Sequence, residues 1–258
     1  MRKLAHIDQA LLHGMFFVQG WSQLGWKAFV RIFRAPWYHR ESLVQFDKLG
    51  YSSLFICTLT GLFTGMVMAL QALIQLKPFA ATSYVGGMVA VTMIKELGPV
   101  LTALMVTGRA GSAITAELGS MRVSEQVDAM RVEGSDVVQR LVTPRLKALL
   151  LALPLLTVMT DACAVLGGFV IATDYGIGPS LYLSTCTQFM VPLDYLEGAV
   201  VKPLAFASIL CLTSCYTGLQ AAGGAEGVGE ATKRAVVVSS IAILMTDFFI
   251  AKLSVLVR

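Results

Sequence analysis

The stretch LGYSSLFICTLTGLFTGMVMALQALIQL, residues 49–76, contains no Asp, Glu, Lys or Arg. Because an α-helix rises about 1.5 Å per residue, roughly 20 apolar residues are enough to cross the ~30 Å hydrocarbon core of a bilayer. The whole chain has the same character, since 56% of its 258 residues are hydrophobic and only 14% are charged. An average soluble domain has about a quarter charged residues. We therefore predict an all-α integral membrane protein.

An N-terminal region, residues 1–48, precedes the first apolar stretch. It holds Trp21, Trp26 and Trp37 among several cations, which is typical of an amphipathic helix lying at the headgroup level. A poor first spanning helix is the alternative. Residues 49–258 are expected to form a five-span membrane domain, with a short helix on the outer surface within 173–198. The expected spans are residues 49–76, 84–117, 146–172, 199–221 and 236–257.

Lys and Arg are concentrated in alternate connections. Seven precede the first span and five lie in residues 118–147, whereas the connections 77–83 and 173–198 contain only Lys77. Cytoplasmic loops carry the excess of Lys and Arg. We therefore expect a cytoplasmic N-terminus and, after five crossings, a C-terminus on the outer side.

Two segments deserve a structural expectation of their own. The second span contains Leu97-Gly98-Pro99, where the missing proline amide should kink or break the helix. Residues 124–134 read as a short cytoplasmic helix with Ser124 as its N-cap. Val123, Val127 and Met130 share one face of it by their i, i+4, i+7 spacing. Such a stripe either docks into a groove of a partner protein or folds back onto its own bundle, and the spacing leaves both open.

Ionisable side chains at or inside the spans are costly, at about 2.5–3.5 kcal/mol each at the bilayer centre unless they are paired or hydrated. We hypothesise that Glu96 and Lys202 face a common cavity and that Arg109 locks helices together through Asp161 or Asp247. The alternative is that all of these groups form ion pairs without a role in binding a substrate. The residues concerned are Lys95, Glu96, Arg109, Asp161, Lys202 and Asp247.

Several functions are not expected. No GxxxxGK[ST] phosphate-binding loop occurs, so the chain is not expected to hydrolyse ATP alone or to be an enzyme. The five cysteines form no CxxC pair, and no metal or other cofactor is expected on this chain. The net charge is +4 without a basic run interleaved with aromatics, so nucleic acid is not an expected partner.

Three motifs follow one another in the second span: ELGP at residues 96–99, GRAGSA at 108–113 and AELG at 116–119. With Gly227-Val228-Gly229 and Asp247 in the same order and spacing, the chain closely resembles the MlaE family of ABC-transporter permeases over about residues 45–255. The resemblance implies a homodimeric, multi-pass permease of the bacterial inner membrane, with a periplasmic C-terminus. Its implied partners are a cytoplasmic ABC ATPase that binds ATP and Mg, a STAS-domain subunit and a membrane-anchored MCE-domain lipid-binding protein.

The resemblance also implies a substrate and roles for residues. The substrate is phospholipid, moved between the inner membrane and a periplasmic route to the outer membrane so that lipid asymmetry is maintained. A gradient-driven carrier using Glu96, Asp161 and Asp247, or a structural anchor for an ATPase and a lipid-binding protein, are the alternatives. The implied polar residues of the lipid cavity are Lys95, Glu96, Lys202 and Asp247, and its apolar lining is Met68, Leu76, Phe79 and Leu97. ATPase coupling falls to Val123, Glu125, Val127, Met130 and Arg131, while Arg109, Glu117 and Asp161 are polar groups within the bundle.

Overall fold

The computed structural model describes residues 2–32, 34, 37–190 and 192–257, and every element in these ranges is helical. The α-helices are α1 Arg2–Ile32, α2 His39–Phe46, α3 Ser52–Leu76, α4 Val85–Thr92, α5 Gly98–Val106, α6 Ser112–Val123, α7 Gln126–Val132, α8 Thr143–Asp174, α9 Pro179–Gln188, α10 Pro192–Leu196, α11 Lys202–Leu219 and α12 Gly224–Val257. Five π-helical turns join or precede them: η1 Asp47–Tyr51, η4 Met93–Leu97, η5 Thr107–Gly111, η6 Val138–Val142 and η7 Glu197–Val201. Two short 3₁₀ turns, η2 Lys77–Phe79 and η3 Thr82–Tyr84, connect α3 to α4.

Five helical segments within the described residues are long and apolar enough to cross a membrane, which confirms the predicted number. They are His39–Phe79, Thr82–Val123, Val138–Asp174, Pro192–Leu219 and Gly224–Leu256. The helices extend beyond the predicted spans because hydropathy marks only the part buried in lipid, whereas backbone hydrogen bonds continue into water. Residues 39–48, predicted to precede the membrane domain, therefore begin the first spanning helix. Lys233 and Arg234, which lie between the fourth and fifth predicted spans, are on α12.

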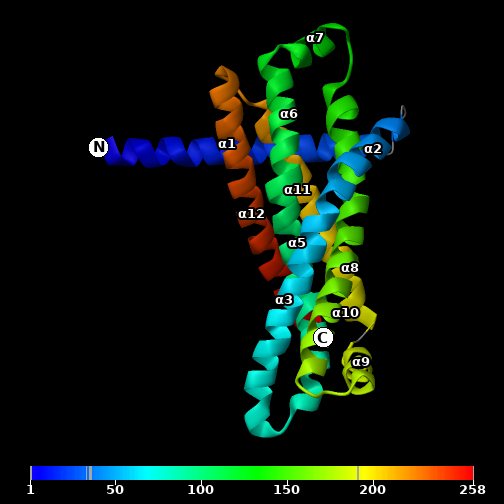
Figure 1. The fold of residues 1–258 in the computed structure, drawn as a ribbon. Coiled ribbons are helices and arrows are strands. Elements are labelled where there is room, and N and C mark those ends of the chain that lie inside the picture. The colour runs from blue at the N-terminus through cyan, green and yellow to red at the C-terminus, as the bar shows by residue number, and fades with distance from the viewer. Residues whose placement is uncertain (1, 33, 35–36, 191, 258) are drawn as a thin grey trace.

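Helix α1 runs crosswise to the bundle, nearer to the end that carries α7 (Figure 1). It contacts α11, η6 and α8. The indole Nε1 of Trp21 donates a hydrogen bond to Thr213 Oγ1 at 3.2 Å, and the ring of Phe17 packs edge-on against Tyr216. This crosswise placement is the one that an interfacial helix requires.

The second spanning helix is continuous through the Leu97-Gly98-Pro99 sequence. The helix is therefore not broken at this proline, and a kink stays a prediction. The chain takes the wider π-helical turn η4 directly before Gly98, and a second one, η5, before Ser112. A π turn changes the hydrogen-bond partners without ending the helix, and such turns are frequent at functional sites.

Helices α3 and α8 cross with their backbones in close contact. Gly61 and Gly65 on α3 lie against the backbone carbonyls of Thr160 and Ala164, and Gly167 on α8 lies against the carbonyl of Leu62. Only residues without a Cβ allow two backbones to approach so closely. The GxxxG pair of α3 thus packs within one chain.

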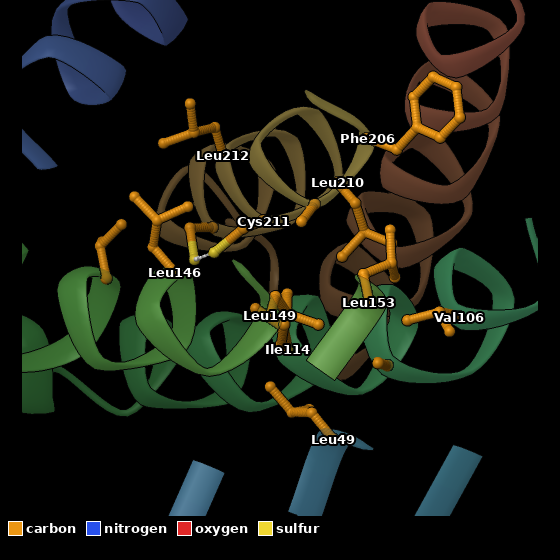
Figure 2. Close-up of a cluster of buried hydrophobic side chains, with 14 of the residues drawn as sticks. Leu49, Val106, Ile114, Leu146, Leu149, Leu153, Phe206, Leu210, Cys211 and Leu212 are labelled. Atoms are coloured by element: carbon orange, nitrogen blue, oxygen red, sulfur yellow. Dashed lines mark hydrogen bonds between the residues drawn. The ribbon is translucent and has the colours of Figure 1, made fainter. Parts of the chain in front are cut away.

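A buried apolar cluster fills the space between α6, α8 and α11. Figure 2 shows Ile114, Leu149 and Leu210, one from each of these helices, among the side chains of this cluster. The cluster holds the spans together at the α7 end of the bundle. Helix α7 and the C-terminus lie at opposite ends of the bundle, and the predicted short helix α9 lies near the C-terminus (Figure 1).

Candidate functional site

Lys202 organises a cluster of charges between the second, fourth and fifth spans. It opens α11, and its side chain is fully buried. Its ammonium lies 2.6 Å from Glu96 Oε2 and 2.9 Å from Asp247 Oδ1, and it donates a hydrogen bond to the Lys95 carbonyl at 2.9 Å. The ammonium thus donates two hydrogen bonds, to Glu96 and to the Lys95 carbonyl, and forms an ion pair without a hydrogen bond to Asp247 Oδ1. The site joins η4, α11 and α12.

Pro99 explains why the Lys95 carbonyl is available. Lys95 lies in the π turn η4, and because proline has no amide hydrogen, Pro99 can donate neither an i+4 bond to the Lys95 carbonyl nor an i+5 bond to the Ile94 carbonyl. Lys202 supplies the missing donor from a neighbouring span. The ELGP sequence therefore creates an acceptor on the second span, and the fourth span provides the cation that meets it.

The π turns η4 and η7 contact each other beside this cluster. Gly198 of η7 lies against the carbonyl of Ile94, and a Cβ there would overlap that oxygen. The same approach brings Lys95 Nζ to 3.5 Å from Asp194 Oδ1. A second ion pair thus lies next to the first, so the two lysines and their three carboxylates form one region with little net charge.

Asp161 lies on α8 next to Gly98 and is buried. Its Oδ1 lacks a hydrogen-bond partner among the residues that the structure describes. The residue borders a cavity of about 390 Å³ that is otherwise lined mainly by apolar side chains, among them Ile94 and Leu166. A methyl group on Gly98 would overlap the carboxylate, so this glycine makes room for it.

The structure changes two of the predicted pairings. Arg109 is exposed, and in the described part of the chain it forms no ion pair with Asp161 or Asp247. Asp247 instead pairs with Lys202, because α12 packs against α5 and η5 at this depth. Glu96 and Lys202 do meet, but Lys202 is sealed inside the bundle and cannot itself line an opening. The Glu96 side chain, 38% exposed, is the member that reaches the surface.

The predicted apolar lining divides into two groups. Leu76 borders a groove of about 440 Å³ that Tyr84, Met88 and Phe189 also line. Phe79 lies exposed at the adjacent turn. Met68 and Leu97 are partly buried and pack against the apolar cluster formed by α3, α4 and α8.

Helix α7 is shorter than the predicted 124–134. It begins after Glu125, which has a left-handed backbone with φ of 61°, and Ser124 Oγ hydrogen-bonds back to the Ser120 carbonyl instead of capping it. Val127 is fully buried in the main apolar cluster, and Met130 packs against that cluster. The stripe thus folds back onto the bundle at these two positions, because the short turn after α6 places that face inward.

The outward surface of the α7 segment consists of other residues. Val132 is 90% exposed and Val123 is 38% exposed, with Glu125 and Arg131 also exposed. Asp128 accepts from Arg122 and Arg131, and the hydrogen bond from Arg122 is the main cause that lowers the pKa of this carboxyl. At neutral pH the segment therefore keeps an ion-pair network at Asp128 beside its exposed valines.

Two polar groups were missed or only partly interpreted from the sequence. Glu117, predicted to lie within the bundle, pairs with Arg145 at 3.1 Å and with Lys48 at 3.0 Å, so it ties three spans together. Asp194 was not singled out, because it lies in the connection interpreted as an outer loop. An acidic residue outside a span is ordinary in a loop, so the sequence does not indicate that Asp194 approaches Lys95.

Sequence comparisons identify the family of this chain and several similar proteins. The family model described as "Permease MlaE" matches residues 42–253. The chain belongs to the MlaE permease family. The matched region contains the five spans except the first residues of the first and the last residues of the fifth, together with the Lys202 cluster and α7. It leaves out α1.

Individual proteins also match over most of the chain. A probable ABC transporter permease protein of Rickettsia bellii is 38% identical over 227 residues, which is 88% of this chain and 87% of the relative. The intermembrane phospholipid transport system permease protein MlaE of Haemophilus influenzae is 35% identical, over 80% of this chain and 79% of the relative. The chloroplastic protein TRIGALACTOSYLDIACYLGLYCEROL 1 of Arabidopsis thaliana is 37% identical, over 86% of this chain and 63% of that protein.

Proposed function

We propose that this MlaE family member is the permease subunit of an ATP-driven transporter that moves phospholipids between the bacterial inner membrane and a periplasmic route to the outer membrane, so that lipid asymmetry is maintained. The observation that carries the proposal is the position of Glu96, which reaches the surface from a buried charge cluster. The same spanning helix carries the apolar groove beside Leu76. An amphiphile needs both an apolar surface for its chains and a polar one for its headgroup. The relatives named as phospholipid and ABC permeases favour the same substrate class and a separate ATPase.

In this proposal the two copies of a homodimer enclose the lipid cavity, with Glu96 of each copy at its polar end. Leu76 and Phe79 line the apolar part, and Met68 and Leu97 support it. The α7 end is cytoplasmic and carries the ATPase, which binds ATP and Mg; a STAS-domain subunit and an MCE-domain protein complete the complex. The C-terminus is periplasmic, in agreement with the Lys and Arg distribution.

The mechanism follows from the charges. Lys202 holds Glu96 in place and leaves the region nearly neutral, so a zwitterionic headgroup is not held by a strong net charge. ATP-driven movement of the two copies then changes the size of the cavity between them. Apolar contacts hold the lipid in the cavity. The described cluster has no excess of cations that would bind the phosphate strongly, so the lipid can leave when the cavity narrows.

Replacing Glu96 with Gln tests the site. We expect ATP-dependent transfer of labelled phospholipid between two liposome populations to fall roughly tenfold, the effect of about 1.4 kcal/mol, because a neutral amide loses the charge-assisted bond to Lys202. Glu133→Gln, an exposed carboxylate after α7, is the matched control and should transfer lipid at the wild-type rate. Equal rates in both variants would refute a role for Glu96.

The same liposomes separate the proposal from its rivals. A partner ATPase that binds but cannot hydrolyse ATP should stop transfer even with an ion gradient across the membrane. Transfer that continues under these conditions would favour a gradient-driven carrier. A photoactivatable phospholipid that labels the wild-type complex nowhere near Leu76 or Glu96 would favour a structural anchor.

Replacing Val132 with Asp tests the ATPase contact. The side chain is exposed, so the change should leave the fold intact, yet it places a charge in the proposed apolar contact. We expect the co-purified ATPase to decrease at least roughly tenfold, since buried unpaired charges cost several kcal/mol. Ser184→Asp is the control, because Ser184 is exposed on α9, at the end of the bundle away from α7 (Figure 1), and this variant should keep the co-purified ATPase at the wild-type level. Undiminished co-purification of Val132→Asp would contradict this docking surface.

A further inference from the structure

A second groove lies between the start of the first spanning helix and α8, far from the Lys202 cluster. It has a volume of about 680 Å³, and we call it the α2–α8 groove. Its lining includes Trp37, His39 and Lys147 at one end and Phe46, Leu151 and Leu155 toward the other. Helix α2 lies at the end of the bundle that carries α7, whereas the Leu76 groove lies at the opposite end (Figure 1).

The polar end of the α2–α8 groove is built around Lys147. Its ammonium donates a hydrogen bond to the Trp37 carbonyl at 3.2 Å and lies 5.2 Å from the centre of the Trp37 ring, which also stacks on His39. None of the ion pairs formed among the described residues includes Lys147, whereas Lys48, Lys95 and Lys202 are each paired with a carboxylate. The Lys147 ammonium therefore has no carboxylate in direct ion-pair contact among the described residues.

The apolar end continues along the helix in the direction of the bilayer centre. Lys147, Leu151 and Leu155 recur every four residues on α8, so they form one row, about 12 Å long at about 1.5 Å per residue. Leu43 and Phe46 of α2 line the other wall. Leu151 is 65% exposed and Leu155 is 58% exposed, so no part of the described chain covers this row.

We propose that the α2–α8 groove binds one acidic phospholipid from the leaflet in which α1 lies, with its phosphate at Lys147 and an acyl chain along Leu151 and Leu155. The arrangement of a cation and a tryptophan ring above a row of leucines matches the order of headgroup, interface and hydrocarbon in that leaflet. The Lys147 ammonium selects the anion, and the leucine row takes the chain. The bound lipid fastens the beginning of the first span to α8, and it is not the transported molecule.

The test uses the fluorescence of Trp37 in the full-length chain. With Trp21→Phe and Trp26→Phe, Trp37 is the remaining tryptophan. The protein is placed in phosphatidylcholine vesicles that contain increasing fractions of a lipid with brominated acyl chains, which quench a tryptophan in contact with them. Brominated phosphatidylglycerol should reach half-maximal quenching at a fraction about fivefold lower than brominated phosphatidylcholine, the preference expected for one lysine at the membrane surface.

Two charge changes distinguish a site from general surface charge. Lys147→Glu should remove the preference for phosphatidylglycerol, and Lys147→Gln should reduce it, because neither leaves a cation for the phosphate. Arg40→Glu is the matched control, because Arg40 is exposed on α2 but does not line the groove. This variant should prefer phosphatidylglycerol about as strongly as the parent protein does. Circular dichroism of each variant is the check that its helices are kept.

Three outcomes would overturn the proposal. One is equal quenching by the two lipids in the parent protein. Another is a loss of preference in Arg40→Glu as large as in Lys147→Glu, which would show only a diffuse attraction. The third is protection of Trp37 from both lipids when the assembled transporter is used, which would assign the groove to a transmembrane helix of a partner. Lipid transfer is not the readout, so a failed test here leaves the transport function untouched.

Discussion

Replacing Lys202 with Met is expected to destabilise the protein by about 3–5 kcal/mol and to abolish lipid transfer, because it leaves Glu96 and Asp247 without their shared cation. Met has nearly the same length, so the change removes a charge without opening a large cavity. Asp247 is mostly buried, at 19% side-chain exposure, and has little water to replace the ammonium. Unfolding of the purified chain in detergent measures the first effect, and the two-liposome transfer assay measures the second.

A triple variant separates a structural role from a role in transport. Lys202→Met with Glu96→Gln and Asp247→Asn removes all three charges together, and neutralising a whole buried group is often without cost, whereas breaking it is not. Stability should therefore return toward the wild-type value. If lipid transfer returns as well, the charges serve only to hold the helices. If transfer stays absent while stability recovers, Glu96 acts on the substrate.

Glu96, Lys202 and Asp247 were all singled out from the sequence, and Glu96 was expected to meet Lys202, but the pairing of Asp247 with Lys202 was not predicted. The energetic cost of a charge in lipid singles out Glu96, Lys202 and Asp247 wherever they pack. Which helices are neighbours, however, depends on the backbone approach at Gly198 and on the π turn before Pro99. Neither has a signature in hydropathy. Arg109 was therefore assigned to partners that it does not contact.

The α7 segment shows a second limit of sequence patterns. Helical spacing places Val127 and Met130 on one face of α7, but Val123 lies on α6, before the turn, and is exposed. The spacing also does not say what that face contacts. The direction of the face depends on the turn at Ser124 and Glu125, where the left-handed φ of Glu125 reverses the chain. That turn points Val127 into the bundle and leaves Val132 outside. The number of spans needed no such detail, since each is marked by its own apolar length.

The α3–α8 crossing yields the last prediction, because it depends on the absence of single methyl groups. A Cβ on Gly65 would overlap the carbonyl, the carbonyl carbon and the Cα of Ala164, which are all backbone atoms and cannot rotate away. Gly65→Ala should therefore push the two helices apart and lower the free energy of unfolding by about 1–3 kcal/mol. Gly61 and Gly167 would lose their close contacts in the same movement, so the effect should be at the upper end of that range.

Gly229→Ala is the matched control, since it makes the same chemical change on a helix. A Cβ on Gly229 meets no atom within contact distance, and alanine is a better helix former than glycine by about 1 kcal/mol. The control should be neutral or slightly stabilised, so the two variants are expected to differ in sign when unfolding is measured in the same detergent. Similar stability of both variants would show that α3 and α8 do not approach through their glycines. In that case, contacts other than these glycines would have to determine how close α8 lies to Gly98, which is next to Asp161.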